Sequence, residues 1–222
     1  MTNLQKRILT SVIILPLSIF FILKGGYFLL FYLLSVFFIA NYELFSVFRK
    51  IKTILFLDFV LIVSLFSIYY LTNNQTSFYL LLWVIILVIC SDIGGYVFGK
   101  IFKWKKLTKI SPKKTLSGVF GSFIFSLLSI FIANATLPWL SYTFLSSKFS
   151  INLLDPKFFF LAIILSLVAQ AGDLTISYFK RIEKIKDTGR ILPGHGGIFD
   201  RIDALMFVVI LTFVLYQIKI IP

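Results

Sequence analysis

The chain has 222 residues, of which 59% are hydrophobic and 14% are charged, and its formal net charge is +13. Soluble proteins carry about 25% charged residues, so this composition excludes a soluble globular protein and indicates an integral membrane protein. The basic residues lie between apolar runs, which argues against nucleic acid as the partner despite the positive charge. The single cysteine, Cys90, excludes a disulfide framework and a cysteine-based zinc site.

Seven apolar runs approach the ~20 residues that a helix needs to cross a hydrocarbon core of ~30 Å. We therefore predict an all-α, polytopic membrane bundle of about seven transmembrane helices that forms a single domain over residues 1–222. Gly25 and Gly26 predict a tight hairpin between the first two helices, and Pro16 predicts a kink in the first. The predicted spans cover residues 8–23, 27–48, 54–71, 78–98, 115–137, 158–174 and 204–221.

The basic residues also predict the topology. With a cytoplasmic N-terminus, 18 of the 22 lysines and arginines lie in inner segments and four lie in outer ones. Cytoplasmic loops of membrane proteins carry such an excess, so we expect a cytoplasmic N-terminus and a location in the inner membrane. The loops of the two segments with candidate functional residues, 91–118 and 173–203, then lie at the cytoplasmic face.

Residues 173–203 hold five of the nine acidic residues of the chain and its only histidine, His195. A helix would line up a carboxylate and ammonium groups along one face here, because helical spacing separates Asp173, Ser177, Lys180 and Lys184. The alternative is a solvated, positively charged loop with no further role. The concentration of acids, cations and glycines within about thirty residues favours a functional site.

Glycines and a proline interrupt the helical pattern after Asp187. Such a loop can adopt positive φ and direct successive N–H groups at an anion, although an ordinary turn has the same composition. Asp200 and Asp203 follow immediately before the last apolar run. Two carboxylates about 5.5 Å apart repel by roughly 3 kcal/mol at an effective dielectric near 20, which a divalent cation would offset. Alternatively, one of them caps the last helix.

At these residues the chain resembles the signature of the phosphatidate cytidylyltransferases, also called CDP-diacylglycerol synthases. The match has no gap, and it runs through Ser177, Lys180, Arg181, Lys186, Asp187, Gly189, Pro193, His195, Gly196, Gly197, Asp200, Arg201 and Asp203. A second stretch of the family appears at residues 91–96, 99–100 and 111–115, and the pair Tyr42 and Glu43 resembles the end of its opening helix pair.

The upstream motif adds a carboxylate and a row of lysines. Asp92 lies near the inner end of the fourth span, where a charge costs about 2.5 to 3.5 kcal/mol, so it should face a polar cavity, a cation or a helix break at Gly94 and Gly95. Residues 100–114 contain seven lysines, which either attach the loop to anionic lipid or bind substrate phosphate. Residues 94–100 resemble a P-loop, but Ile101 replaces its Ser or Thr, so we discount that reading.

We predict that Asp173, Asp200 and Asp203, assisted by Asp187, hold Mg²⁺ and a second cation near it. Basic side chains would neutralise the phosphates, and His195 would order the loop or donate to the leaving group. Glu43 and Asp58 are expected to make polar contacts between helices. The other catalytic candidates are Ser177, Lys180, Arg181, Lys186 and Arg201, and the substrate-binding candidates are Asp92, Ser111, Lys113, Lys114, Thr115, Gly196 and Gly197.

The resemblance implies transfer of a cytidylyl group from CTP to phosphatidate, which gives CDP-diacylglycerol and pyrophosphate. The expected partners are CTP, phosphatidate and the lipid bilayer, and the resemblance also implies a homodimer. A CTP-dependent polyprenol or phytol kinase is one alternative, against which the unbroken signature argues. An ion-coupled transporter is another, but transporter sites usually lie near the membrane midplane, and here the acidic residues cluster on one side.

Overall fold

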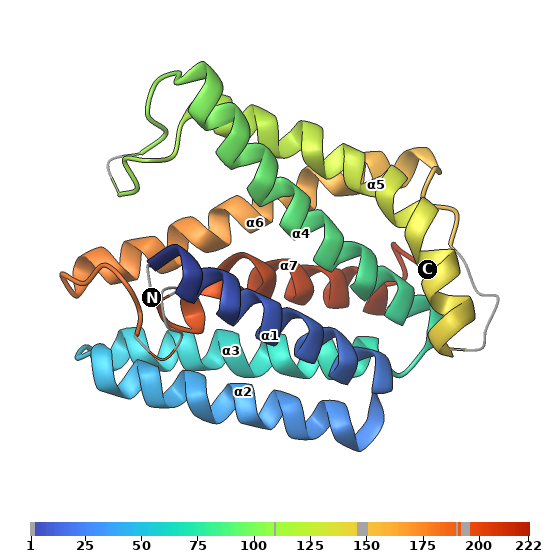
Figure 1. The fold of residues 1–222 in the computed structure, drawn as a ribbon, viewed down its shortest axis with the longest axis horizontal. Helices are drawn as coiled ribbons and strands as arrows, with labels where there is room; N and C mark the ends of the chain where they lie inside the picture. Colours follow the sequence, from blue (N-terminus) through green and yellow to red (C-terminus); the bar gives the residue numbers. More distant parts are fainter. Residues whose placement is uncertain (1–2, 109, 146–150, 190, 192–195) are drawn as a thin grey trace.

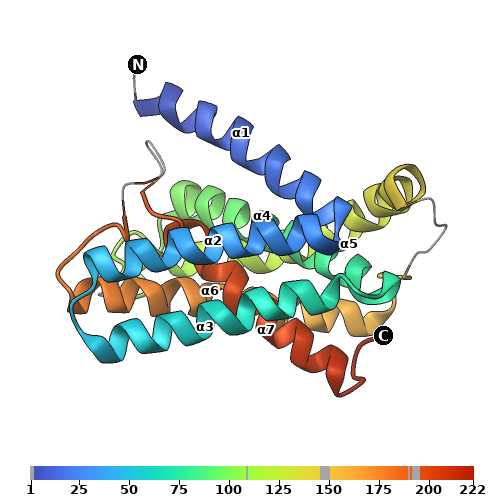
Figure 2. The same cartoon turned by 90° about the horizontal axis from the view of Figure 1, so that it is seen from below.

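The computed structural model describes residues 3–108, 110–145, 151–189, 191 and 196–222. Across these residues the chain forms seven α-helices that run back and forth between the two ends of one bundle (Figures 1 and 2). The predicted all-α bundle is therefore confirmed, and each predicted run corresponds to one helix. The helices are α1 (Asn3–Lys24), α2 (Gly26–Val47), α3 (Ile51–Leu71), α4 (Gln75–Phe102), α5 (Leu116–Leu145), α6 (Pro156–Ile182) and α7 (Phe199–Gln217).

Five of these helices, α2 to α6, are long and apolar enough to cross a membrane. The chain is therefore a multi-pass membrane protein. In α1 the section Val12–Lys24 is apolar, and in α7 three charged residues occupy the first five positions. Large apolar side chains such as Phe45, Phe59 and Phe160 remain exposed on the outside of the bundle, as expected for a surface that faces lipid.

The helix boundaries exclude one alternative and correct two predictions. The helix α4 continues through Gly94 and Gly95 to Phe102, so there is no break for Asp92 to cap, and residues 94–100 form part of a helix, in agreement with discounting a P-loop. The helix α6 ends at Ile182, and Lys184 adopts a left-handed φ of 58°, so Lys184 does not extend the row of Asp173, Ser177 and Lys180. The helix α7 begins at Phe199, five residues before the predicted span.

Glycines bring α4 and α5 into close contact. A Cβ on Gly94 would overlap the carbonyl oxygen of Gly121 and lie 2.6 Å from Cβ of Phe125. Ser122 Oγ also donates to the carbonyl oxygen of Ser91 at 2.9 Å. Small residues at a helix interface let two backbones approach closely in a membrane, where lipid tails give no net hydrophobic drive. The glycines of the upstream motif therefore have a packing role.

Replacing Gly94 by alanine is expected to destabilise the bundle by about 1 to 3 kcal/mol, because the added methyl group overpacks the α4–α5 interface. Thermal unfolding of the protein purified in detergent measures the effect. The neighbouring Ile93 has 48% of its surface exposed, so Ile93→Ala serves as the control with little expected change. An unchanged midpoint for Gly94→Ala would contradict the close approach of these helices.

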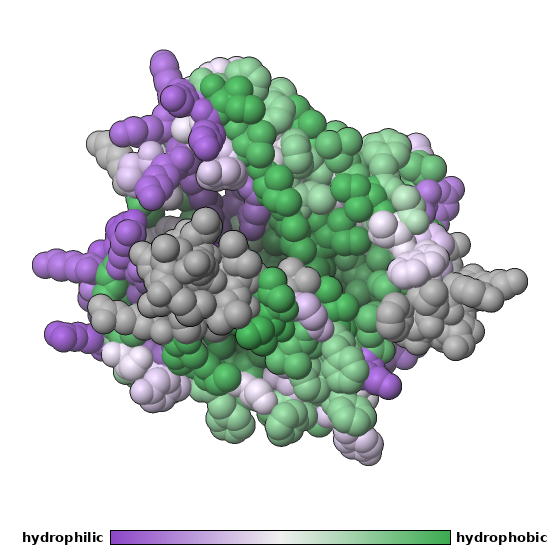
Figure 3. Space-filling model, in the orientation of Figure 1, coloured by the Kyte–Doolittle hydropathy of each residue, from purple (hydrophilic) through white to green (hydrophobic). Residues whose placement is uncertain are grey.

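The polar segments gather at one end of the bundle. The start of α1 and the α2–α3, α4–α5 and α6–α7 connections lie together there (Figure 1). Hydrophilic side chains cluster at this end, while the middle of the same face is hydrophobic (Figure 3). The fold therefore brings the two candidate motifs, far apart in the sequence, to the same end of the molecule.

Candidate active site

Asp200 organises the α6–α7 connection. Its Oδ1 atom accepts a hydrogen bond from Lys180 Nζ at 2.7 Å, and the two side chains are only 9% and 12% exposed. Its Oδ2 atom accepts from the backbone N–H groups of Thr188 at 2.8 Å and Gly197 at 3.1 Å. Because charge-assisted hydrogen bonds are about twice as strong as neutral ones, this carboxylate holds both ends of the connection against α6.

Asp173 joins α6 to the lysine-rich loop of the upstream motif. Its Oδ2 atom lies 2.5 Å from Lys114 Nζ, and its Oδ1 atom accepts from Ser177 Oγ at 3.3 Å. Arg181 reinforces the junction, since its Nε atom donates to the carbonyl oxygen of Ile110 at 3.3 Å. The two motifs therefore meet through one carboxylate and two cations.

Asp203 lies one helical turn beyond Asp200, before the apolar part of α7. Its Oδ1 atom accepts from the backbone N–H of Ala204 at 2.9 Å. Burial first, and then the negative charge of Asp173, raise the pKa of Asp203 above the usual range of a carboxyl. The charge of Asp173 also acts on Asp92 in α4. Asp173 in α6 therefore acts electrostatically on a carboxylate of α4 and on one of α7.

The predicted metal ligands are only partly brought together. Asp173 and Asp203 interact electrostatically. The oxygens of Asp173 are engaged by Lys114 and Ser177, and those of Asp200 by Lys180 and by the loop. Within the described ranges no three His, Cys, Asp or Glu side chains lie close enough to form a ready-made metal site. Mg²⁺ is usually held by one or two carboxylates together with substrate phosphates and water, so Asp173 and Asp203 have suitable chemistry for it. The role of Asp200 as a ligand stays a prediction.

The other predicted site residues differ in exposure and in the contacts that they make. Thr115 lies directly before α5, and its Oγ1 atom accepts from the N–H of Gly118 at 3.1 Å, so this hydroxyl caps the helix. Gly196 has a φ of 86°, which is the loop conformation that the glycines predicted. His195, Pro193 and Gly194 lie outside the described residues. The side chains of Lys113, Lys186, Asp187 and Arg201 are exposed, that of Ser111 is half-buried and Gly197 is buried.

Two glutamates that are not among the signature residues hold backbone segments near the site. Glu43 in α2 accepts from the N–H of Ile198 at 2.6 Å through its Oε2 atom. Glu183 accepts from the N–H groups of Lys50 at 3.0 Å and Arg49 at 3.4 Å, at the start of α3. The sequence assigned Glu43 only a contact between helices and gave Glu183 no role. A carboxylate near the end of a helix could have indicated such a role. The sequence did not show which backbone N–H groups, far away in the chain, it would bind.

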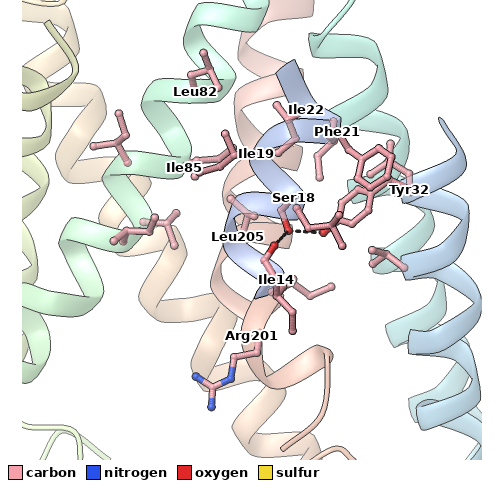
Figure 4. A pocket seen from close by; sticks show the side chains of 18 of the residues that line it. Ile14, Ser18, Ile19, Phe21, Ile22, Tyr32, Leu82, Ile85, Arg201 and Leu205 are labelled. Atoms are coloured by element: carbon pink, nitrogen blue, oxygen red, sulfur yellow. Dashed lines mark hydrogen bonds between the residues drawn. The ribbon is translucent and has the colours of Figure 1, made fainter. Parts of the chain in front are cut away.

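A large cavity leads from this site into the bundle. It has a volume of about 1190 Å³ and lies among α1, α2, α3, α4, α5 and α7. Most of its lining is apolar, and Asp92 and Arg201 are the charged residues in it. Arg201 lies at one end, and the apolar side chains of α1, α4 and α7 line the space beyond it (Figure 4). Ser18 and Tyr32 join α1 to α2 beside the cavity by a 2.6 Å hydrogen bond. An apolar cavity with a charged end suits an amphipathic ligand.

These features define a multi-pass membrane protein with a cationic and acidic site at one end of its bundle. Residues 47–219 match the family model described as "Cytidylyltransferase family". The chain belongs to the cytidylyltransferase family.

Three curated relatives are each named phosphatidate cytidylyltransferase. The protein of Staphylococcus epidermidis is 40% identical over 64% of this chain and 50% of its own length. That of Rickettsia conorii is 31% identical over 96% of this chain and 91% of its own length. That of Helicobacter pylori is 38% identical over 57% of this chain and 43% of its own length. The chain spans about half the length of the staphylococcal relatives that it matches.

Proposed function

We propose that this chain transfers a cytidylyl group from CTP to phosphatidate. The observation that carries the proposal is the convergence of the two motifs at the polar end of the apolar cavity, where Lys114, Lys180 and Arg201 accompany Asp173 and Asp203. Family membership and the printed names of the relatives support it. Such a site can receive a soluble nucleotide and a lipid at the same interface.

In this reaction a phosphate oxygen of phosphatidate attacks the α-phosphorus of CTP. The new P–O bond forms as the bond to the bridging oxygen of the β-phosphate breaks, and pyrophosphate leaves with that electron pair. A phosphate monoester is already mostly ionised near neutral pH, so no strong base is required. The main requirement is positive charge, because two anions must approach each other and a third must depart. Lys180, Arg181, Lys186 and Arg201 supply that charge in the proposal.

Asp173 and Asp203 are the pair that we propose for Mg²⁺, with Asp200 and Asp187 as nearby carboxylates and a second cation close by. When bound, the ion would supply charge to the phosphates and relieve the repulsion between the two carboxylates. Asp200 meanwhile holds the loop by accepting from the N–H of Gly197, and we assign the N–H of Gly196 to substrate phosphate. Ser111, Lys113, Lys114 and Thr115 approach the same region from the α4–α5 loop and complete the substrate-binding set.

The cavity gives the acyl chains of phosphatidate a place beside the site. Its apolar lining suits hydrocarbon, and Arg201 at its end suits the lipid phosphate, since guanidinium groups bind phosphate oxygens in a bidentate manner. Asp92, which also lines the cavity, would orient Arg201 or Lys114. His195 is assigned to ordering the loop around the leaving group.

The proposal includes a topology. Seven membrane-spanning helices with the N-terminus in the cytoplasm would place all four basic segments at the cytoplasmic face of the inner membrane, where CTP is available. The excess of 18 among the 22 basic residues supports this orientation. The family resemblance also leads us to propose a homodimer.

An assay of the purified protein in detergent with labelled CTP, phosphatidate and Mg²⁺ tests the function. We expect cytidylylated lipid and pyrophosphate in equal amounts, with product formation abolished by EDTA and restored by added Mg²⁺. A phosphorylated alcohol from polyprenol or phytol would indicate the kinase instead. Absence of turnover with every acceptor, combined with ion-dependent transport in vesicles, would indicate a transporter and overturn the proposal.

A further inference from the structure

Glu43 is a buried carboxylate that the reaction itself does not use. It lies in the last turns of α2, and its side chain is 1% exposed. Its Oε2 atom accepts a 2.6 Å hydrogen bond from the N–H of Ile198, the residue directly before α7. Because Asp200 lies two residues further on, Glu43 fixes the backbone at the point where the signature loop enters the helix that carries Asp200 and Asp203.

The loop is shaped around this carboxylate. A Cβ on Gly189 would overlap Glu43 Oε1 and lie 2.5 Å from Glu43 Cδ, and one on Gly197 would lie 2.7 Å from Glu43 Oε2. Both glycines have negative φ, so the need for glycine does not come from an unusual backbone angle. It comes from close approach to Glu43 at Gly189, and from close approach to both Thr188 Oγ1 and Glu43 at Gly197. Both described ends of the loop therefore contact the side chain of Glu43.

Asp200 contacts the same loop at neighbouring residues. It accepts from the N–H groups of Thr188 and Gly197, which are the chain neighbours of Gly189 and Ile198. The loop is thus held by a carboxylate from α2 and by a carboxylate from α7. Neither hydrogen bond to Asp200 can keep its geometry if the loop moves away from α2, so Glu43 influences the position of Asp200 and of the Lys180 ion pair.

We infer that Glu43 is a positioning residue of the active site: it tethers the two described ends of the glycine loop, residues 187–189 and 196–198, to α2 and so orients the groups that bind the triphosphate. The inference rests on the proposed function for its kinetic consequences. The glycine loop is the part of the site that we assign to the triphosphate, so loss of Glu43 should weaken nucleotide binding more than lipid binding.

The isosteric Glu43→Gln change separates hydrogen bonding from charge. Glu43 Oε1 has no hydrogen-bond partner among the described residues, so a glutamine can place its amide nitrogen there and still accept from Ile198 with its oxygen. We expect Glu43→Gln to keep the KM for CTP within about threefold of the wild type. Glu43→Ala removes the acceptor, and outer contacts of this kind are typically worth 10- to 100-fold, so we expect its KM for CTP to rise by about tenfold or more.

The experiment compares wild type, Glu43→Ala, Glu43→Gln and the control Tyr42→Phe, a neighbour on α2 whose ring is 69% exposed. Steady-state kinetics give separate KM values for CTP and phosphatidate, and hydrogen exchange followed by mass spectrometry reports on residues 187–198. Glu43→Ala should exchange faster in that segment alone. A purely structural role would lower the melting temperature and the active fraction while leaving the KM for CTP unchanged.

The close approach of Gly189 to Glu43 provides a second test of the tether. Gly189→Ala alone should impair the enzyme, because its methyl group overlaps Glu43. Combining it with Glu43→Ala removes the obstacle, so the double variant should be less impaired than the sum of the single changes predicts, since residues in contact are not additive. Additive effects would overturn the tether. If Glu43→Ala fails to fold, the same measurements are made on Glu43→Asp, whose side chain is one methylene shorter.

The exchange measurement keeps this inference separate from the proposed function. If the wild type makes no cytidylylated lipid, the proposed function fails, yet faster exchange of residues 187–198 in Glu43→Ala would still support the tether. Unchanged exchange, together with an unchanged KM for CTP where turnover is measurable, overturns it.

Discussion

Replacing Asp200 by asparagine is expected to lower the rate of cytidylyl transfer by at least about a hundredfold, because misplacement of a catalytic group by about 1 Å has an effect of this size. The amide loses the charge that pairs with Lys180 and cannot accept equally well from Thr188 and Gly197. Turnover of labelled CTP at saturating phosphatidate measures the change. Retained activity would exclude Asp200 both as a metal ligand and as the residue that organises the loop.

The double variant Lys180→Met with Asp200→Asn separates the loss of cytidylyl transfer from misfolding. Removing one partner of a buried ion pair is destabilising by about 3 to 5 kcal/mol, whereas removing both leaves no unpaired charge. We therefore expect the double variant to recover most of the thermal stability lost in either single variant. Its activity should stay low, because the loop has still lost its carboxylate and the phosphates have lost a cation. Recovery of both properties together would assign the pair a structural role only.

Replacing Asp173 by asparagine is expected to lower the rate roughly 10²- to 10³-fold, the size typical of a lost electrostatic contact to the reacting groups. This carboxylate meets Lys114 from the upstream motif and acts on Asp203. If Asp173 also contributes to the Mg²⁺ site, the concentration of Mg²⁺ needed for half-maximal activity should rise. A titration with Mg²⁺ at fixed CTP measures this directly.

Asp155 provides a matched control on the same helix. It caps the opposite end of α6, where its side chain accepts from the N–H of Lys157 at 3.1 Å. Asp155→Asn preserves an acceptor at the cap and lies far along the helix from the site, so we expect nearly unchanged activity and Mg²⁺ dependence. Equal losses in Asp155→Asn and Asp173→Asn would show that α6 is simply sensitive to substitution.

The sequence predicted the helices well because a membrane span is a local property. A run of apolar residues must satisfy its own backbone hydrogen bonds in lipid, so composition and length are enough to indicate a helix. Gly25 and Gly26, with φ values of 63° and 53°, form the predicted hairpin. Helix boundaries also depend on packing: α7 begins five residues before the predicted span, at Phe199, which is fully buried against neighbouring helices.

The functional residues were identified by type and only partly by arrangement. The sequence placed Asp173, Ser177 and Lys180 on one helix face and brought the two motifs to the same end of the molecule. It did not reveal that Asp200 accepts from two backbone N–H groups, nor that Thr115 caps α5. Such roles depend on which donor lies nearby in space, and a backbone N–H has no distinguishing mark in the sequence.

The amino-acid sequence by itself determined that this protein is a helical membrane protein, which side chains are available for phosphate chemistry, and that they lie in two segments. Only the tertiary structure decided which carboxylates face each other and which ones hold the loop. The reason is that hydrophobicity and helical spacing act over a few residues, whereas the contacts of Glu43 with Ile198 and of Lys114 with Asp173 join residues far apart in the chain.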